Sequence, residues 1–338
     1  MIIVIKPGTP RPQIDEVIAE VQKLGYDPRP IHGTEQTIVA AIGDERTHHT
    51  LESLNALPQV EKVLPVQKKH KLVARESVPA GTVVNVDGVP VGGPKFVLMA
   101  GPCSVESEEQ LLTTAHAVKE AGATILRGGA YKPRTSPYEF QGLGKEGLRL
   151  LAKAKAETGL RIITELLSED HIEHVAEVAD ILQIGARNAQ NFQLLIGAAK
   201  TGKPVLLKRG LSQRIEEWLC AAEYLLAHGN GNVMFCERGI RTFETYTRNT
   251  LDLAAVAIVK KESHLPVIID PSQGAGRADL VRALCKGSVA MGADGLLVEV
   301  HPNPKVALSD GAQQIDFEGF KGLVADLQPL LTACGRTL

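Results

Sequence analysis

The sequence lacks the features that assign a chain to a membrane, to nucleic acid or to an oxidising compartment. No apolar run approaches the roughly 18–20 residues that span a bilayer, so we expect no membrane partner. A formal net charge of −2 argues against a nucleic-acid partner. The 5 cysteines are scattered and odd in number, which is typical of reduced thiols in a cytoplasmic protein. Residues 1–8 lack the basic region of a signal peptide and predict a strand instead.

The 338 residues, 44% of them hydrophobic, suit one large domain and one small domain. In the small domain, residues 1–66, we predict strands at 2–6, 26–31, 36–42 and 59–65 and helices at 10–24 and 46–56. This βαββαβ order is the ferredoxin-like plan. The segment has no cluster of catalytic residue types, and we expect it to regulate or assemble the rest. The polar, basic residues 67–79 are predicted to be a linker.

The large domain, residues 80–338, is predicted to begin with a β-hairpin at 83–91 around the turn Asp87-Gly88. From residue 96 the chain repeats a short apolar run, a loop and an amphipathic helix. Eight such units over about 240 residues predict a (β/α)₈ TIM barrel of the α/β class, with the hairpin capping its bottom. The predicted strands are 96–100, 124–126, 161–164, 181–184, 205–207, 233–235, 267–269 and 295–298.

The loop after the second strand, residues 127–137, carries the strongest functional signal. Arg127, Lys132 and Arg134 lie within eight residues, beside the hydroxyl groups of Thr135 and Ser136. Arginine offers a planar fork to phosphate and lysine offers a point charge. Two glycines and two prolines restrict the shape of this loop, which a merely solvated basic loop would not need. We therefore favour a phosphate site over a solvated surface loop.

Polar residues follow the other strands as well, and barrel enzymes carry their chemistry at this end. Arg187, Lys208 and Arg238 follow the fourth, fifth and sixth strands. Converging cations repel one another unless anions lie between them, so we expect two phosphorylated ligands. Glu165 and Asp270 end two further strands. Cys103, Glu299 and Asp310 have metal-ligand chemistry that suits a borderline or hard divalent ion.

Two other patterns in the sequence, at Lys208 and at residues 142–147, have alternative interpretations. Lys208 could be a Schiff-base lysine, with a pKa lowered by the adjacent Arg209, but a phosphate-binding role is at least as compatible with the surrounding cations. Residues 142–147 match a dinucleotide fingerprint in spelling, yet they follow a Pro-rich loop where the fingerprint needs a strand. We interpret them as a loop and the start of a helix.

Five motifs together closely resemble 3-deoxy-D-arabino-heptulosonate 7-phosphate (DAHP) synthases. The resemblance covers essentially the whole chain and, with the small N-terminal domain, is similar to the type I beta subgroup. Lys132-Pro133-Arg134-Thr135 is the discriminating stretch, because the sister 3-deoxy-octulosonate 8-phosphate synthases carry a Lys-Ala-Asn-Arg-Ser type sequence there. The motifs are residues 100–104, 127–137, 184–188, 207–210 and 237–239.

The resemblance implies that phosphoenolpyruvate condenses with D-erythrose 4-phosphate and phosphate is released, the first step of the shikimate pathway to aromatic amino acids. It implies that Arg134, Thr135 and Ser136 bind erythrose 4-phosphate. It assigns catalytic roles to Lys132, Glu165 and Asp270, with Lys132 or Glu165 handling a proton when water adds to C2. The residues implied to bind phosphoenolpyruvate are Arg127, Lys132, Ala186 through its backbone amide, Arg187, Lys208 and Arg238.

The resemblance also implies a divalent ion (Mn, Mg, Co, Fe or Zn) that polarises the aldehyde, held by Cys103, Gln273, Glu299 and Asp310. Gln273 departs from the histidine of the family's Asp-Pro-Ser-His motif. An amide oxygen is a poorer ligand for transition metals than an imidazole, so we expect weaker metal binding, with His301 as a residue that could compensate. The remaining implied partners are an aromatic amino acid effector for residues 1–66, near the loop at 29–34, and further copies of the chain in a homo-oligomer, a tetramer.

Overall fold

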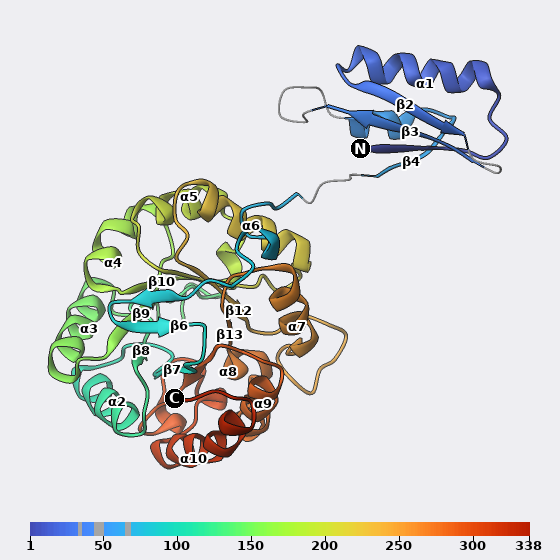
Figure 1. The fold of residues 1–338 in the computed structure, drawn as a ribbon. Coiled ribbons are helices and arrows are strands. Elements are labelled where there is room, and N and C mark those ends of the chain that lie inside the picture. Colours follow the sequence, from blue (N-terminus) through green and yellow to red (C-terminus); the bar gives the residue numbers. More distant parts are fainter. Residues whose placement is uncertain (33–35, 44–50, 65–68) are drawn as a thin grey trace. The chain divides into compact units, whose positions relative to one another are not determined.

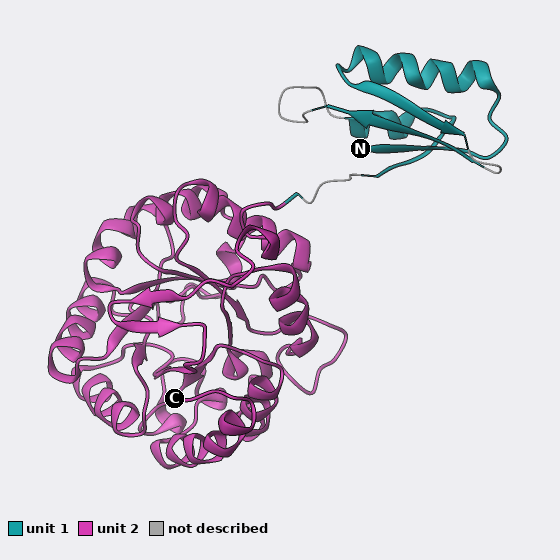
Figure 2. Cartoon of the chain, viewed as in Figure 1, with its two compact units in different colours: residues 1–69 teal, residues 70–338 magenta. Residues whose placement is uncertain are grey.

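The computed structural model describes residues 1–32, 36–43, 51–64 and 69–338, which fall into two compact units, Met1–Lys69 and His70–Leu338 (Figure 2). The division lies inside the predicted linker, 67–79, whose second part packs on the larger unit. The backbone N–H groups of Lys71, Leu72 and Val73 donate to the Glu223 carboxylate over 2.8–2.9 Å. Val73 is completely buried. The predicted linker therefore extends too far into the larger unit.

The first unit is an antiparallel sheet with strand order β2-β3-β1-β4, formed by Ile2–Ile5 (β1), Asp27–His32 (β2), Thr37–Ile42 (β3) and Val60–Leu64 (β4). Helix α1, Arg11–Lys23, lies along one face of it (Figure 1) and buries Ile14, Val17 and Val21, which helical spacing puts on one side. This arrangement confirms the ferredoxin-like prediction.

One element of the first unit differs from its prediction. In place of the helix expected at 46–56, the structure has a 3₁₀ helix at Leu51–Ala56, and residues 46–50 lie outside the described ranges. Leu51 and Leu54 are both buried. They are three residues apart, which is the period of a 3₁₀ helix, so this geometry turns both toward the core. The predicted effector loop at 29–34 differs too, since Arg29 to His32 belong to β2 and residues 33–34 are not described.

The second unit is a closed barrel of eight parallel strands that neighbour one another in chain order. Helices surround it (Figure 1), which confirms the TIM-barrel prediction. None of the helices in the described ranges has the length and apolar character to cross a membrane. The strands are β7 Val97–Gly101, β8 Ile125–Arg127, β9 Arg161–Glu165, β10 Ile181–Ile184, β11 Val205–Lys208, β12 Val233–Glu237, β13 Val267–Ile269 and β14 Gly295–Glu299. The helices are α2 Glu108–Glu120, α3 Lys145–Thr158, α4 Ile172–Val178, α5 Phe192–Lys200, α6 Ile215–Ala227, α7 Leu253–Glu262, α8 Pro271–Ala275, α9 Ala278–Ala290 and α10 Phe317–Ala333.

The predicted hairpin forms the floor of the barrel. Strands β5 (Val84–Val86) and β6 (Val89–Val91) pair antiparallel, and Asp87 and Gly88 have φ values of 46° and 93°. Two successive positive φ angles are the signature of a type I′ turn, which Asp-Gly favours. Buried valines of the hairpin pack against the first inward-facing residues of the barrel strands, such as Val97 and Ile125.

The alternation of side chains along the strands positions the functional residues. Neighbouring side chains of a strand point to opposite faces, so the residue two places after an inward apolar residue faces inward too. In seven strands that second residue is polar and lies at the C-terminal end of the barrel. The pairs are Ile125 and Arg127, Ile163 and Glu165, Ile181 and Gln183, Leu206 and Lys208, Cys236 and Arg238, Ile268 and Asp270, and Leu297 and Glu299.

Candidate active site

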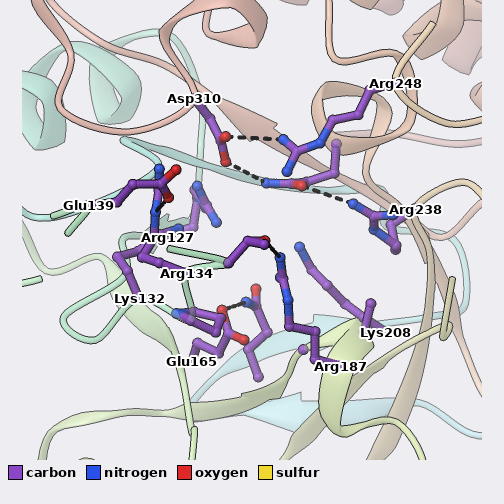
Figure 3. A pocket seen from close by; sticks show the side chains of 16 residues that line it. Arg127, Lys132, Arg134, Glu139, Glu165, Arg187, Lys208, Arg238, Arg248 and Asp310 are labelled. Atoms are coloured by element: carbon purple, nitrogen blue, oxygen red, sulfur yellow. Dashed lines mark hydrogen bonds and ion pairs between the residues drawn. The ribbon is translucent and has the colours of Figure 1, made fainter. Parts of the chain in front are cut away.

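A polar cavity of about 240 Å³ lies at the C-terminal ends of the barrel strands (Figure 3). Among the described residues that line it, seven are cationic and three are carboxylates, which leaves a surplus of four positive charges. Such a surplus favours anionic ligands. The lining residues are Arg127, Lys132, Pro133, Arg134, Thr135, Glu139, Glu165, Gln183, Gly185, Ala186, Arg187, Lys208, Arg238, Arg248, Gln273 and Asp310.

Most of the residues predicted to bind substrates lie on this wall, with one exception. Ser136 does not line the cavity, and its hydroxyl accepts a hydrogen bond from the Tyr138 backbone at 3.4 Å. Three polar lining residues were not predicted: Glu139, Gln183 and Arg248. The alternation of β10 would have identified Gln183, whereas Arg248 comes from the long loop after β12. Arg248 donates to Asp310 at 3.0 Å and to Gln313 at 3.1 Å.

Arg127 is held at the base of the cavity. Its Nη1 donates to the Pro102 carbonyl at 3.0 Å and to Glu299 Oε1 at 2.9 Å. Burial is the largest influence and acts against its charge, but Glu299, Cys103 and Asp270 together outweigh burial and raise the pKa of the guanidinium. Its buried Nε finds no hydrogen-bond partner within the described part of the chain. A donor without a partner in a buried site is a position that an anionic ligand would satisfy.

Lys132 reaches back toward Cys103. Its Nζ donates to the Cys103 carbonyl oxygen and to Cys103 Sγ, both at 3.1 Å. Burial and the nearby Glu299 raise the pKa of the Cys103 thiol to about 12, in spite of Lys132. Glu165 ends β9, the strand next to β8, and packs against Gly185, where a Cβ would come within 2.0 Å of Glu165 Oε1. Glycine at 185 is therefore required for this carboxylate to occupy its position.

Lys208 forms a buried ion pair with Asp270, with Nζ 2.6 Å from Oδ2. The other Asp270 oxygen accepts the Gln273 backbone N–H at 2.9 Å and caps helix α8. Asp270 is completely buried and does not line the cavity. Its position fits a residue that orients Lys208 rather than one that contacts a ligand. An amine engaged in this pair is also poorly placed to attack a carbonyl, which disfavours the Schiff-base alternative for Lys208.

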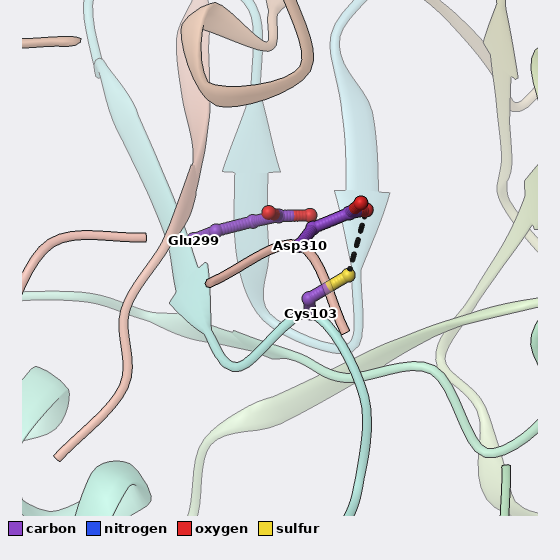
Figure 4. A group of neighbouring side chains, drawn as sticks. All are labelled: Cys103, Glu299 and Asp310. Carbon is purple, nitrogen blue, oxygen red and sulfur yellow. Dashed lines mark hydrogen bonds between the residues drawn. The ribbon is translucent and has the colours of Figure 1, made fainter. Parts of the chain in front are cut away.

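Cys103, Glu299 and Asp310 form a compact group beside the cavity (Figure 4). Each offers one ligand atom, and these atoms lie within 4.8 Å of one another. Metal–ligand bonds are about 2.0–2.4 Å long, so three such atoms can share one ion. Burial is the largest influence on the pKa of Asp310 and raises it, but the charges of Arg248 and Lys132, together with hydrogen bonds from Cys103 and Gln273, lower this pKa to about 2. The fourth predicted ligand, Gln273, contacts Glu299 and Asp310 through its amide nitrogen and not its oxygen. His301, which the sequence suggested could compensate for Gln273, faces Glu106, with its Nε2 3.4 Å from the Glu106 carboxylate.

Arg209 lies behind the cavity wall and not in it. Its Nη1 donates to Glu237 at 3.0 Å and to Asp252 at 2.9 Å, and its guanidinium lies over the Trp218 ring. The other oxygen of the completely buried Glu237 accepts the N–H of Gly239 at 2.6 Å. Gly239 has a φ of 87°, which favours glycine. Arg209 and Glu237 thus hold the turn that presents Arg238, and neither residue's role was predicted.

Both units match known families. Residues 1–68 match the DAHP synthase ferredoxin-like domain, and residues 76–333 match the DAHP synthetase I family. A Thermotoga maritima protein named phospho-2-dehydro-3-deoxyheptonate aldolase is 50% identical over 335 residues, or 99% of each chain. A Methylococcus capsulatus protein named 2-dehydro-3-deoxyphosphooctonate aldolase is 35% identical over 271 residues, 74% of this chain and 93% of its own.

Two solved structures are also similar to this chain. The crystal structure of the DAHP synthase from Thermotoga maritima has a TM-score of 0.95 at 50% identity, covering 99% of this chain and 98% of that one. A truncated form of the synthase from the same organism has a TM-score of 0.75 at 53% identity and covers 79% of this chain and 98% of its own.

Glu237→Ala should destabilise the barrel by about 3–5 kcal/mol, because it leaves the buried Arg209 without its main partner. Glu237→Gln keeps an acceptor for the Gly239 N–H and should cost less. Urea unfolding followed by the fluorescence of Trp218, the single tryptophan, reports the barrel unit. If the alanine variant unfolds at the same urea concentration as the parent, the buried pair does not stabilise this turn.

Proposed function

The chain belongs to the DAHP synthetase I family, and from that membership we propose that its barrel mouth is the active site of a DAHP synthase. The enzyme condenses phosphoenolpyruvate with D-erythrose 4-phosphate and releases phosphate, at the start of the route to aromatic amino acids. The observation that carries this proposal is the cavity with seven cations, reached by the loop that contains Lys132-Pro133-Arg134-Thr135. Two phosphorylated substrates supply the negative charge that this cavity lacks.

Phosphoenolpyruvate is assigned to the deeper part of the cavity. The unpartnered Nε of Arg127 and the buried side chains of Lys208 and Arg238 support this position. A carboxylate and a phosphate both accept paired N–H bonds from arginine, and a buried pair of this kind is stronger than an exposed one. Arg187, Lys132 and the Ala186 backbone N–H complete the assignment.

Erythrose 4-phosphate is assigned to the outer part of the cavity, at Arg134 and Thr135. Arg134 donates to Glu139 at 2.6 Å and to Ser309 at 2.8 Å, which points its guanidinium along the rim. Thr135 lies 3.5 Å from Arg187, between the two assigned positions. Ser136 does not line the cavity, so the assignment rests on Arg134 and Thr135.

The reaction forms a carbon–carbon bond, consumes one water molecule and releases phosphate. C3 of phosphoenolpyruvate attacks the aldehyde carbon, water adds at C2, and the C2–O bond to phosphate then breaks. Lys132 and Glu165 are the side chains assigned to hold and move the water's protons, because both line the cavity. Asp270 acts on Lys208 and is a positioning residue, which replaces the catalytic role first predicted for it. The surrounding arginines align the two anions and balance their charge.

A divalent ion fits the group formed by Cys103, Glu299 and Asp310. The thiol and two carboxylates are chemically suited to it, and their ligand atoms are close enough for one ion. When bound, the ion supplies Lewis-acid polarisation of the aldehyde oxygen. Lys132 and Arg127 contact the same group and balance the charge of these residues.

Residues 1–69 are assigned to regulation by an aromatic amino acid, the end product of the route. The match to a ferredoxin-like domain of DAHP synthases supports a regulatory unit. We also propose a homo-oligomer, a tetramer, and a cytoplasmic location. The five cysteines all lie in the described residues and form no disulfide, which supports a reducing compartment.

The reaction itself is tested by phosphate release. We expect release only with phosphoenolpyruvate and erythrose 4-phosphate together, and much less with arabinose 5-phosphate, the aldose of the octulosonate branch. Borohydride added during turnover should leave Lys208 unmodified by mass spectrometry. A reduced adduct on Lys208 would establish the Schiff-base alternative instead. Binding of both substrates without phosphate release would point to a sensor.

Arg134→Ala should raise the KM for erythrose 4-phosphate by about 10- to 100-fold, because one charge-assisted contact to phosphate is lost. The KM for phosphoenolpyruvate should stay within a factor of two or so of the parent value. Arg149→Ala is the matched control, since Arg149 forms an exposed pair with Glu146 away from the cavity. An equal rise in both KM values would refute the division of the cavity between the two substrates.

Removal of residues 1–69 should leave the synthase active and insensitive to aromatic amino acids. The division between Lys69 and His70 and the solved truncated relative both support a barrel that folds alone. The measurement is the initial rate of the full-length and truncated proteins with tyrosine, phenylalanine or tryptophan. If the full-length protein responds to none of them, regulation fails as the role. Light scattering of both proteins then decides whether the unit serves assembly.

A further inference from the structure

Gln273 connects two groups that have opposite hydrogen-bonding requirements. On one side, Arg238 Nη2 donates to the Gln273 amide oxygen at 2.9 Å. On the other side, the Gln273 amide nitrogen donates to Glu299 Oε1 at 3.0 Å and to Asp310 Oδ2 at 3.3 Å. Glu299 and Asp310 are two of the three residues in the candidate metal group.

The partners dictate which way this amide points. A guanidinium can only donate hydrogen bonds, and ionised carboxylates can only accept them. Turning the amide over would set its NH₂ group against Arg238 and its oxygen against Glu299 and Asp310. Both sides would then be repulsive, and buried polar groups would lose their partners.

The backbone of Gln273 is also held on both sides. Its N–H donates to Asp270 Oδ1 at 2.9 Å, and its carbonyl accepts from Asn249 Nδ2 at 2.9 Å. The side chain therefore starts from a fixed point at the first turn of α8. It has little freedom to present the oxygen to the metal group from another direction.

We propose that Gln273 is not a metal ligand in this chain but a hydrogen-bond donor that competes with the ion. The nitrogen of an amide has no lone pair available for a metal, since that pair is delocalised into the carbonyl. An ion that binds Cys103, Glu299 and Asp310 has to displace the two bonds from this nitrogen. The ion is then held by three protein ligands, and the amide binds the empty group more strongly than the occupied one.

This proposal deepens the metal site of the proposed function, but it can be tested without the reaction. The probe is Mn²⁺ alone, added to chelator-treated full-length protein without substrates, with the free ion measured by electron paramagnetic resonance. Failure of the proposed reaction would leave the metal titration unaffected. Asp310→Asn establishes that the titration reports this site, because it removes one ligand and should abolish or strongly weaken binding.

The decisive variant is Gln273→Ala. It removes the competing donor and leaves room for a water ligand, so we expect the Kd for Mn²⁺ to fall by about 10-fold, the equivalent of one charge-assisted hydrogen bond. Gln273→His supplies a nitrogen lone pair and should tighten binding as well. Gln328→Ala, a change at an exposed glutamine of α10, is the matched control and should leave the Kd unchanged.

The outcomes separate the alternatives. If Gln273→Ala raises the Kd while Gln273→His lowers it, the amide oxygen is a ligand and the proposal is wrong. If neither variant changes the Kd, Gln273 does not act on the ion, and the proposal is again wrong. Trp218 fluorescence and circular dichroism confirm that each variant is folded, and the histidine variant provides a second measurement should the alanine variant not fold.

Discussion

The barrel mouth depends on one electrostatic constraint: several cations lie close together, and the deeper ones are buried. A buried cation is stable only when a carboxylate or a comparable group lies beside it. Arg127 has Glu299, Lys208 has Asp270, and Arg209 has Glu237. These partners are completely buried and come from the neighbouring strand or from the next strand but one. Glu299 and Asp270 neutralise Arg127 and Lys208, and the other lining residues still carry more positive than negative charge, which attracts anionic ligands.

These pairings also connect the anion-binding residues to the metal group. Glu299 is at once the partner of Arg127 and a member of that group. Asp270 holds Lys208 through one oxygen and the backbone of Gln273 through the other. Arg238 reaches the same group through the Gln273 side chain. A change at any of these residues therefore affects both halves of the site, and its consequences have to be separated by measuring metal and substrate binding independently.

Much of the fold and the inner site could be predicted from the sequence, because both follow from local patterns. Short apolar runs separated by helical patterns identify the barrel. The alternation along each strand places Arg127, Glu165 and Lys208 inside its mouth.

The position of Arg248 could not be predicted in this way, because Arg248 lies in a long loop whose path depends on contacts with Asp310 and Gln313. The orientation of the Gln273 amide could not be predicted either, since that depends on which side chains surround it in space. The end of the linker was misplaced for a similar reason: its basic residues appear solvated until Glu223, about 150 residues later, is brought beside them.

The hairpin of β5 and β6 has a consequence for the path by which molecules enter and leave the site. It closes the floor of the barrel, so ligands reach the described cavity from the mouth. The cations lie at two depths, with Arg127 and Lys208 buried and Arg248 exposed at the rim. A molecule held at the inner level therefore has to pass the rim both on its way in and on its way out. The hairpin thus leaves the described cavity with one entrance, which incoming ligands and departing products have to share.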